Sequence, residues 1–194
     1  MITIFAAVEK RQIEKFESGA VHKKAFNNLL VKSNRISLFQ IDRALNVLAG
    51  GDEDSPFWAI FGGDVLTAAG GEEMTVDPIP FEKRSSGPLE TCDPAVYQNE
   101  EETALISAFL EQIDEAAFRK HFDARIIKLT RWSFFSQRKR ELKENADEIF
   151  DVFWGEFSRL KSFYKNIQAG ECIVIFSLYE EEDFEVSSGS DWSD

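Results

Sequence analysis

Two adjoining segments near the end of the chain decide the fold: Asn145-Ala-Asp-Glu-Ile-Phe-Asp-Val-Phe-Trp-Gly-Glu-Phe-Ser-Arg-Leu-Lys-Ser-Phe-Tyr-Lys-Asn-Ile-Gln-Ala-Gly170 and Glu171-Cys-Ile-Val-Ile-Phe-Ser-Leu-Tyr179. In the first, apolar residues recur at the three- and four-residue spacing of one helix face, and Gly170 ends the pattern. These apolar positions are Ile149, Phe150, Val152, Phe153, Phe157, Leu160, Phe163 and Tyr164. The second segment has the composition of a buried strand. We interpret the aromatic stripe as core, not as a cofactor site.

The segment at the other end of the chain, residues 2–8, also predicts a buried strand. Between the two strands, the pattern predicts an extended piece near 36–41 and a buried apolar run at 57–61. It predicts an irregular stretch over 68–88 and helices over about 9–19, 21–32, 42–49, 99–113 and 114–122. Helices dominate and no βαβ alternation appears, so we expect a single compact α+β domain over 1–180, with a small sheet that uses the N-terminal and C-terminal strands. An acidic tail is expected over 181–194.

Charge is the main clue to partners. The 194 residues include 35 acidic and 22 basic side chains, a net charge of -13, and seven acids without a base lie between Glu180 and Asp194. Such a surface repels a phosphate backbone, so we expect no nucleic-acid partner. It favours a basic protein partner, because opposite charge speeds encounter. The alternative is that the charge serves solubility alone.

Cysteine usage and hydropathy bear on the compartment. Cys92 and Cys172 are far apart and form no C-x-x-C pair, which is typical of a reduced compartment. No apolar run approaches 18 residues, so we expect no membrane span. The apolar N-terminus is short and no basic residue precedes it, unlike a signal peptide. We therefore predict a cytoplasmic protein.

The sequence contains few residues arranged as in known catalytic or metal-binding motifs. His22 and His121 are the two histidines, and His121 with Asp123 forms an H-x-D pair that is more simply read as a turn, with Asp123 capping the next helix. No nucleophile elbow, phosphate-binding glycine loop or EF-hand spacing occurs. We predict no catalytic residues, no cofactor and no metal site.

One basic stretch, residues 119–143, contains nine basic and two acidic residues with aromatic residues between them. Such interleaving suits single-stranded nucleic acid, but the overall charge opposes it. The alternative is an internal partner, either the acidic tail or the glutamates at 100–102.

Four segments in this order resemble the YfbM-like bacterial family, a domain of unknown function: Ile41-Asp-Arg-Ala-Leu-Asn-Val-Leu-Ala-Gly50, Ser55-Pro-Phe-Trp-Ala-Ile-Phe-Gly-Gly63, His121-Phe-Asp123 and Leu160-Lys-Ser-Phe-Tyr-Lys-Asn-Ile-Gln-Ala-Gly170. The chain departs from the family pattern where a helical Trp is replaced near Ala44 or Leu45. It departs again where an R-F-D-P motif reads His121-Phe-Asp-Ala124, and where a G-Y-G-P-A-R phrase is reduced to Gly87-Pro88-Leu89. The resemblance implies a compact α+β domain and no established activity.

The resemblance also implies a place beside toxin genes, so we expect a non-enzymatic immunity protein that binds and neutralises a toxin with a basic face. The predicted contacts are the acidic loops and a tail tryptophan: Asp52, Glu53, Asp54, Glu72, Glu73 and Trp192. The alternative is a small-molecule-binding domain or small enzyme with a cleft near Trp58, His121 and Trp132.

Overall fold

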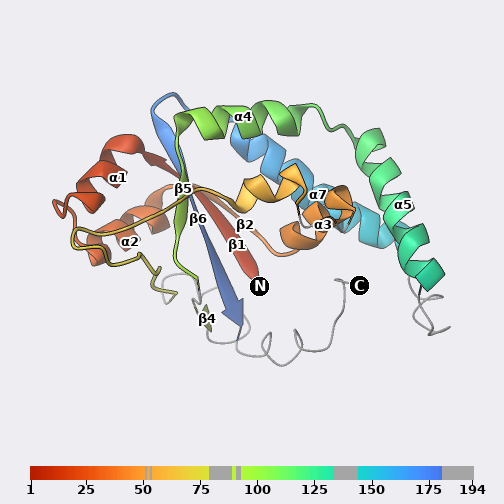
Figure 1. Ribbon diagram of the computed structural model, residues 1–194, viewed down its shortest axis with the longest axis horizontal. Helices are drawn as coiled ribbons and strands as arrows, with labels where there is room; N and C mark the ends of the chain where they lie inside the picture. The colour runs from red at the N-terminus through yellow and green to blue at the C-terminus, as the bar shows by residue number, and fades with distance from the viewer. Residues whose placement is uncertain (51, 53, 79–88, 91–92, 133–143, 181–194) are drawn as a thin grey trace.

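The computed structural model describes residues 1–50, 52, 54–78, 89–90, 93–132 and 144–180 (Figure 1). Its elements are β1 (Ile2–Glu9), α1 (Lys10–Glu17), α2 (Lys23–Lys32), β2 (Asn34–Leu38), α3 (Ile41–Ala49), the 3-10 helix η1 (Pro56–Phe61), β3 (Asp64–Val65), β4 (Leu89–Glu90), β5 (Val96–Gln98), α4 (Glu100–Glu111), α5 (Glu115–Trp132), α7 (Ala146–Lys165) and β6 (Glu171–Glu180). The predicted tail over 181–194 lies outside the described residues, so its boundary stays a prediction.

The strands form one antiparallel sheet in the order β2-β1-β6-β5-β3, and β4 also pairs with β6. The longest pairing joins β1 and β6, from Ile2 opposite Leu178 to Glu9 opposite Glu171. The predicted α+β domain with a sheet built on its first and last strands is thereby confirmed.

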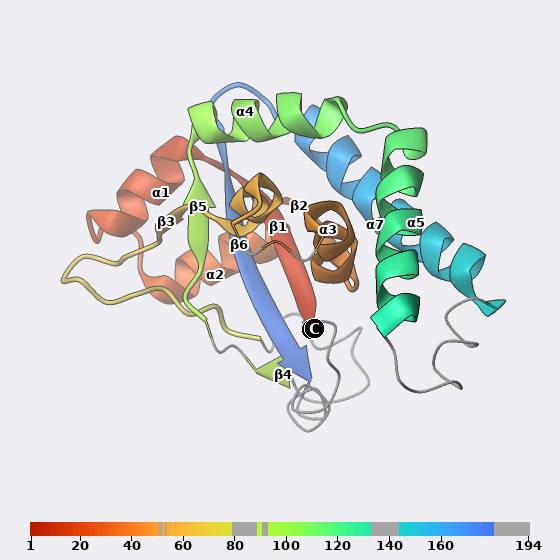
Figure 2. The ribbon, with the colours of Figure 1, turned by 45° about the vertical axis from the view of Figure 1, so that its right-hand side comes forward.

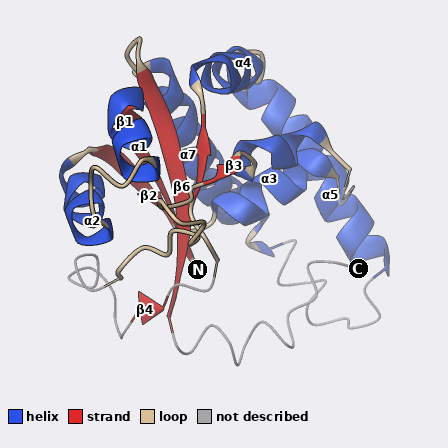
Figure 3. Ribbon diagram, turned by 60° about the vertical axis from the view of Figure 1, so that its left-hand side comes forward, coloured by secondary structure: helices blue, strands red, loops and turns tan. Residues whose placement is uncertain are grey.

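Helices cover both faces of the sheet. Successive side chains of a strand point to opposite faces, so alternate residues of β1 pack against different helices. Ile2, Ile4, Ala6 and Val8 of β1 pack in a cluster with buried residues of α1 and α2. Phe5 and Ala7 point the other way and pack with α3, α4, α5 and α7. Figure 3 shows the strands with α1 and α2 on one side and α3, α4 and α5 on the other.

α7 is the main helix of the second layer. Its buried side chains are Phe150, Phe153, Phe157, Leu160, Phe163 and Tyr164, as the aromatic stripe predicts. The Phe157 ring centroid lies 5.2 Å from that of Phe118 on α5 and 6.0 Å from that of Trp154. The predicted burial of Val152 is wrong, because its side chain is 51% exposed. It lies between the stripe residues in sequence but on the outward side of the helix.

Two further details of the predicted elements are wrong. The helical spacing over 99–113 places Leu105 in an apolar stripe, but Leu105 on α4 is 72% exposed, because the inward face of that helix is formed by Thr103 and Leu110 with Ile106. The apolar run at 57–61 forms the 3-10 helix η1, in which only Ile60 is buried. A 3-10 helix has three residues per turn, so its side chains spread around the axis.

The expected turn at His121–Asp123 is also wrong, because both residues lie inside α5. Asp114 does begin the helix, since its Oδ1 accepts a hydrogen bond from the backbone N–H of Ala117 at 2.7 Å. The helix does not end at Phe122, because Phe118, Phe122 and Arg125 are all buried at helical spacing. The buried face therefore continues beyond the predicted end.

Candidate interaction site

The described residues hold one cysteine, Cys172, and its environment makes it inert. It lies on β6, buried within the α1–α2 cluster. Burial, together with the charge of Glu100, raises the pKa of the thiol to about 11. The reactive thiolate is therefore scarce near neutral pH.

His121 and Asp123 do not act as a pair. His121 is exposed, and its ring centroid lies 6.5 Å from that of Phe57 on η1. Asp123 Oδ1 instead accepts a hydrogen bond from Arg119 Nε at 2.9 Å. Arg119 Nη2 also donates to Asp147 Oδ1 at 2.7 Å, so this arginine ties α5 to α7. In the part of the chain that the structure describes, no group of three or more His, Cys, Asp or Glu side chains is placed to hold a metal ion.

Part of the basic stretch has internal partners, although not those expected. Besides Arg119, the buried Arg125 donates from Nη2 to Asn46 Oδ1 at 3.2 Å and from Nη1 to the Gly50 carbonyl at 3.4 Å. The positive charge of Arg125 lies at the C-terminal end of α3, where it interacts favourably with the negative end of the helix dipole. Residues 133–143 lie outside the described residues, as does the predicted acidic tail partner.

A buried polar pair beneath η1 has a structural role. The Tyr164 hydroxyl donates to Gln98 Oε1 at 2.7 Å, and Gln98 Nε2 donates to the carbonyls of Ile60 at 3.0 Å and Gly62 at 2.9 Å. Burial raises the pKa of Tyr164, so its proton stays on the phenol. The pair joins α7, β5 and η1 and offers no acid or base to a substrate.

Trp58 and His121, two residues of the predicted cleft, make separate contacts, and the cleft itself stays a prediction. Trp58 Nε1 donates to the Asp52 carbonyl at 2.9 Å, and the Trp58 ring stacks on Phe61. His121 contacts Phe57 instead. The third predicted member, Trp132, has a side chain outside the described part of the structure. Trp58 therefore holds the loop that carries Asp52.

The predicted acidic contacts occupy two separate loops. Asp52 and Asp54 are exposed between α3 and η1, and Asp52 Oδ1 accepts from the Asp54 N–H at 3.1 Å. Glu72 and Glu73 are exposed in a turn beside α2, where Glu72 Oε1 lies 3.9 Å from Lys23 Nζ. The first loop adjoins the α7 side of the sheet and the second adjoins the α1–α2 side. Glu53 and Trp192 lie outside the described residues.

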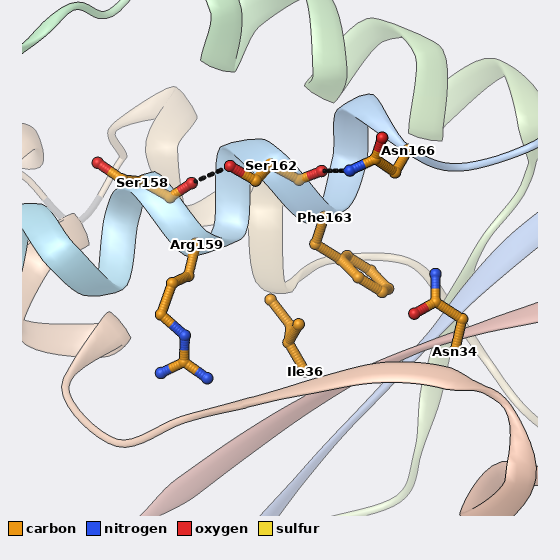
Figure 4. A pocket seen from close by; sticks show the side chains of 7 residues that line it. All are labelled: Asn34, Ile36, Ser158, Arg159, Ser162, Phe163 and Asn166. Carbon is orange, nitrogen blue, oxygen red and sulfur yellow. Dashed lines mark hydrogen bonds between the residues drawn. The ribbon is translucent and has the colours of Figure 1, made fainter.

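A groove of about 400 Å³ lies between β2 and α7, on the edge of the sheet (Figure 4). It is lined by Asn34, Ile36, Ser158, Arg159, Ser162, Phe163 and Asn166. Ile36 and Phe163 contribute its apolar walls from opposite elements (Figure 4). Ser162 Oγ donates to the Ser158 carbonyl at 2.9 Å and Asn166 Nδ2 donates to the Ser162 carbonyl at 2.7 Å, so both donors serve α7 itself.

Beside the groove, α7 covers part of the sheet edge. Arg159 Nη2 donates to the Ser37 carbonyl at 3.0 Å, and Glu156 Oε2 accepts from the Phe39 N–H at 2.8 Å. Glu156 and Arg159 also pair with each other at 2.9 Å. Covering an edge strand in this way opposes its pairing with another chain. No local sequence pattern predicts this contact, because more than a hundred residues separate its partners.

These features define an α+β domain with an antiparallel sheet between two layers of helices. The chain belongs to the family called "Domain of unknown function (DUF1877)", whose model matches residues 1–177. It is similar in structure to YfbM from Escherichia coli, a protein of unknown function, with a TM-score of 0.56 and 18% sequence identity. The match covers 90% of this chain and 98% of that one. The resemblance seen in the sequence is confirmed at the level of family and fold.

The comparison with curated proteins gives no match. Within the described residues, the helices are too short or too polar to cross a membrane.

Proposed function

We propose that this chain is a non-enzymatic protein-binding domain, and more specifically an immunity protein that binds and neutralises a bacterial toxin with a basic face. The observation that carries the proposal is the net charge of -13, together with acidic loops that project from both layers of the domain. Asp52, Asp54, Glu72 and Glu73 are all exposed.

Charge of this kind serves an inhibitor well. A negative surface attracts a positive one over about 10 Å at 0.1 M salt, which raises the association rate and orients the encounter. An inhibitor needs fast capture and a stable complex but no reactive group. The buried, protonated thiol of Cys172 and the internally bonded Tyr164 are consistent with that requirement.

Co-expression tests the proposal directly. The chain is produced in a bacterial host together with the product of a neighbouring toxin gene, and growth is measured with and without the chain. We expect growth arrest by the toxin to be relieved and the two proteins to form a purifiable complex. Growth arrest that persists when the chain is abundant and folded contradicts the proposal.

Charge-reversal variants of the two acidic loops then identify which loop faces the partner. Because the two acidic loops adjoin opposite sides of the sheet, a single flat interface reaches one of them. We expect either Asp52→Lys with Asp54→Lys, or Glu72→Lys with Glu73→Lys, to slow association at low salt by tenfold or more. The other pair is the matched control and should change the rate only through total charge.

A second candidate function, binding of a small molecule, is favoured by the groove between β2 and α7. Its test is a ligand screen by thermal shift with a groove-filling variant, Ser162→Trp, and a control at an exposed position outside the groove, Gln168→Trp. A ligand that stabilises the wild type and the control but not Ser162→Trp supports this function. A screen in which every ligand also stabilises Ser162→Trp contradicts it.

A further inference from the structure

The outward face of α4 carries an exposed apolar residue and, six positions further along, an acid that the helix dipole disfavours. Leu105 is 72% exposed, more than any other large apolar side chain in the described residues. Glu111 lies in the last turn, where the negative end of the helix dipole disfavours an acid, and no basic residue lies in that turn. Leu105 gains no burial within the domain and Glu111 is disfavoured by the helix dipole, so both side chains are available to a partner.

The residues around these two positions form one continuous strip, which we name the α4 ridge. Its members are exposed and follow helical spacing: Glu101, Ala104, Leu105, Ala108, Glu111 and Gln112. The two alanines are too short to cover Leu105, and a glutamate lies toward each end. α4 carries four glutamates and no basic residue. The ridge therefore has an apolar centre, and it lies on a helix whose charged residues are all acidic.

The helix beneath the ridge is firmly held. Asn99 Oδ1 accepts hydrogen bonds from the N–H groups of Glu101 at 2.9 Å and Glu102 at 3.1 Å, and Glu102 Oε2 accepts from the Asn99 N–H at 2.9 Å. Thr103 and Leu110 fix the inward face in the core. α4 runs along the outside of the domain, at the top of Figures 1 and 2. A pre-ordered surface loses little conformational entropy when a partner docks.

We propose that the α4 ridge docks a basic segment of the protein partner, one that presents an apolar side chain between lysines or arginines. This inference rests on the proposed function and adds the α4 ridge to the interface that one of the acidic loops is proposed to form. The apolar contact is made by Leu105, and the basic groups pair with Glu101 and Glu111. Anionic lipid surfaces carry the same sign as the ridge and are repelled by it.

The probe is a synthetic 14-residue amphipathic helix in which leucines alternate with lysines at helical spacing, titrated into isotopically labelled protein. We expect NMR shift changes centred on residues 101–112. Leu105→Ser and Glu111→Lys should each weaken binding at least tenfold. The matched controls are Val152→Ser and Glu148→Lys, an exposed aliphatic residue and an exposed acid on α7, which should weaken it less than twofold. Equal weakening by controls and ridge variants, or shifts spread over all acidic loops, overturns the proposal.

All four substitutions replace exposed side chains, so a loss of binding is not explained by loss of fold, and thermal melts verify this. The same variants are then used with the neutralised toxin. Toxin capture that is unaffected by Leu105→Ser and Glu111→Lys overturns the ridge while the proposed function stands. Peptide binding at the ridge without any toxin neutralisation supports the ridge and contradicts the proposed function.

Discussion

The two faces of the sheet are covered in different ways. On the α7 side, eight residues of the described buried cluster are aromatic, and rings from α5 and α7 contact one another. On the α1–α2 side, three are aromatic, and the cover consists of two short helices with residues from the loop after β3. Interlocking rings on long helices add stability beyond their buried area. We therefore infer that the α7 side carries more of the folding free energy.

The largest expected effect is that of Phe157→Ala. Phe157 is fully buried and contacts both Phe118 and Trp154, so its truncation should cost about 5 kcal/mol, the upper part of the usual range. Phe26 on α2 is equally buried but has a ring contact with Phe16 alone among the described aromatic pairs, so Phe26→Ala should cost about 3 kcal/mol. Denaturant unfolding measures both, and a larger loss at Phe26 would reverse the comparison.

Next in size is Tyr164→Phe, which leaves Gln98 Oε1 buried without its donor. The expected cost is about 1–3 kcal/mol, the usual penalty for an unsatisfied buried acceptor. A double-mutant cycle with Gln98→Leu measures the coupling of the pair, and the double variant should lose less stability than the sum of the two single variants. Additive effects in that cycle would show that the bond does not join η1 to α7 energetically.

A smaller gain is expected from Gly155→Ala on α7. A Cβ at this position meets no atom within 4 Å, so the methyl group fits without strain. Alanine in place of glycine inside a helix should stabilise the fold by about 0.5–1 kcal/mol. Thermal and denaturant melts give the value, with Val152→Ser as an exposed control on the same helix. Destabilisation would indicate that the glycine is required by a contact outside the described residues.

The smallest effect concerns Glu17 on the α1–α2 side. Burial raises the pKa of this carboxyl, and the hydrogen bond from Tyr97 offsets part of the shift. A raised folded-state pKa means that ionised Glu17 destabilises the fold at neutral pH, and that the penalty disappears as pH falls through the folded-state pKa. Glu17→Gln should therefore be slightly more stable than the wild type at pH 7 and equal to it at acidic pH. A variant that is less stable at pH 7 contradicts this sign.

Periodic segments made most of the fold predictable. The stripe from Phe150 to Tyr164 indicated α7, and the apolar runs at 2–8 and 171–179 indicated β1 and β6. Errors arose where a local pattern has two structural outcomes. The apolar residues of α4 match two overlapping stripes, and the contacts with α7 and the sheet, which are not local, select Thr103 and Leu110 for burial.

The candidate surfaces were harder to predict than the fold. The groove between β2 and α7 and the contact of Arg159 with the Ser37 carbonyl join segments far apart in sequence. The acidic loops were identified by composition, but the sequence could not show that Asp52 and Glu72 adjoin opposite sides of the sheet. Exposure of Leu105 is likewise a tertiary property, because it depends on which side of the helix the core selects.

The pairing of β1 with β6 at the centre of the sheet also determines when the domain can form. Ile2 lies opposite Leu178, so the longest strand pair closes a loop of nearly the whole described chain. Contacts of such sequence separation form slowly, because the entropy of loop closure is lost before they contribute. During synthesis, β1 can pair with β2 early but has to wait for β6 to emerge, with its other edge unpaired until then. We expect this waiting period to be the stage at which the nascent chain most depends on chaperones.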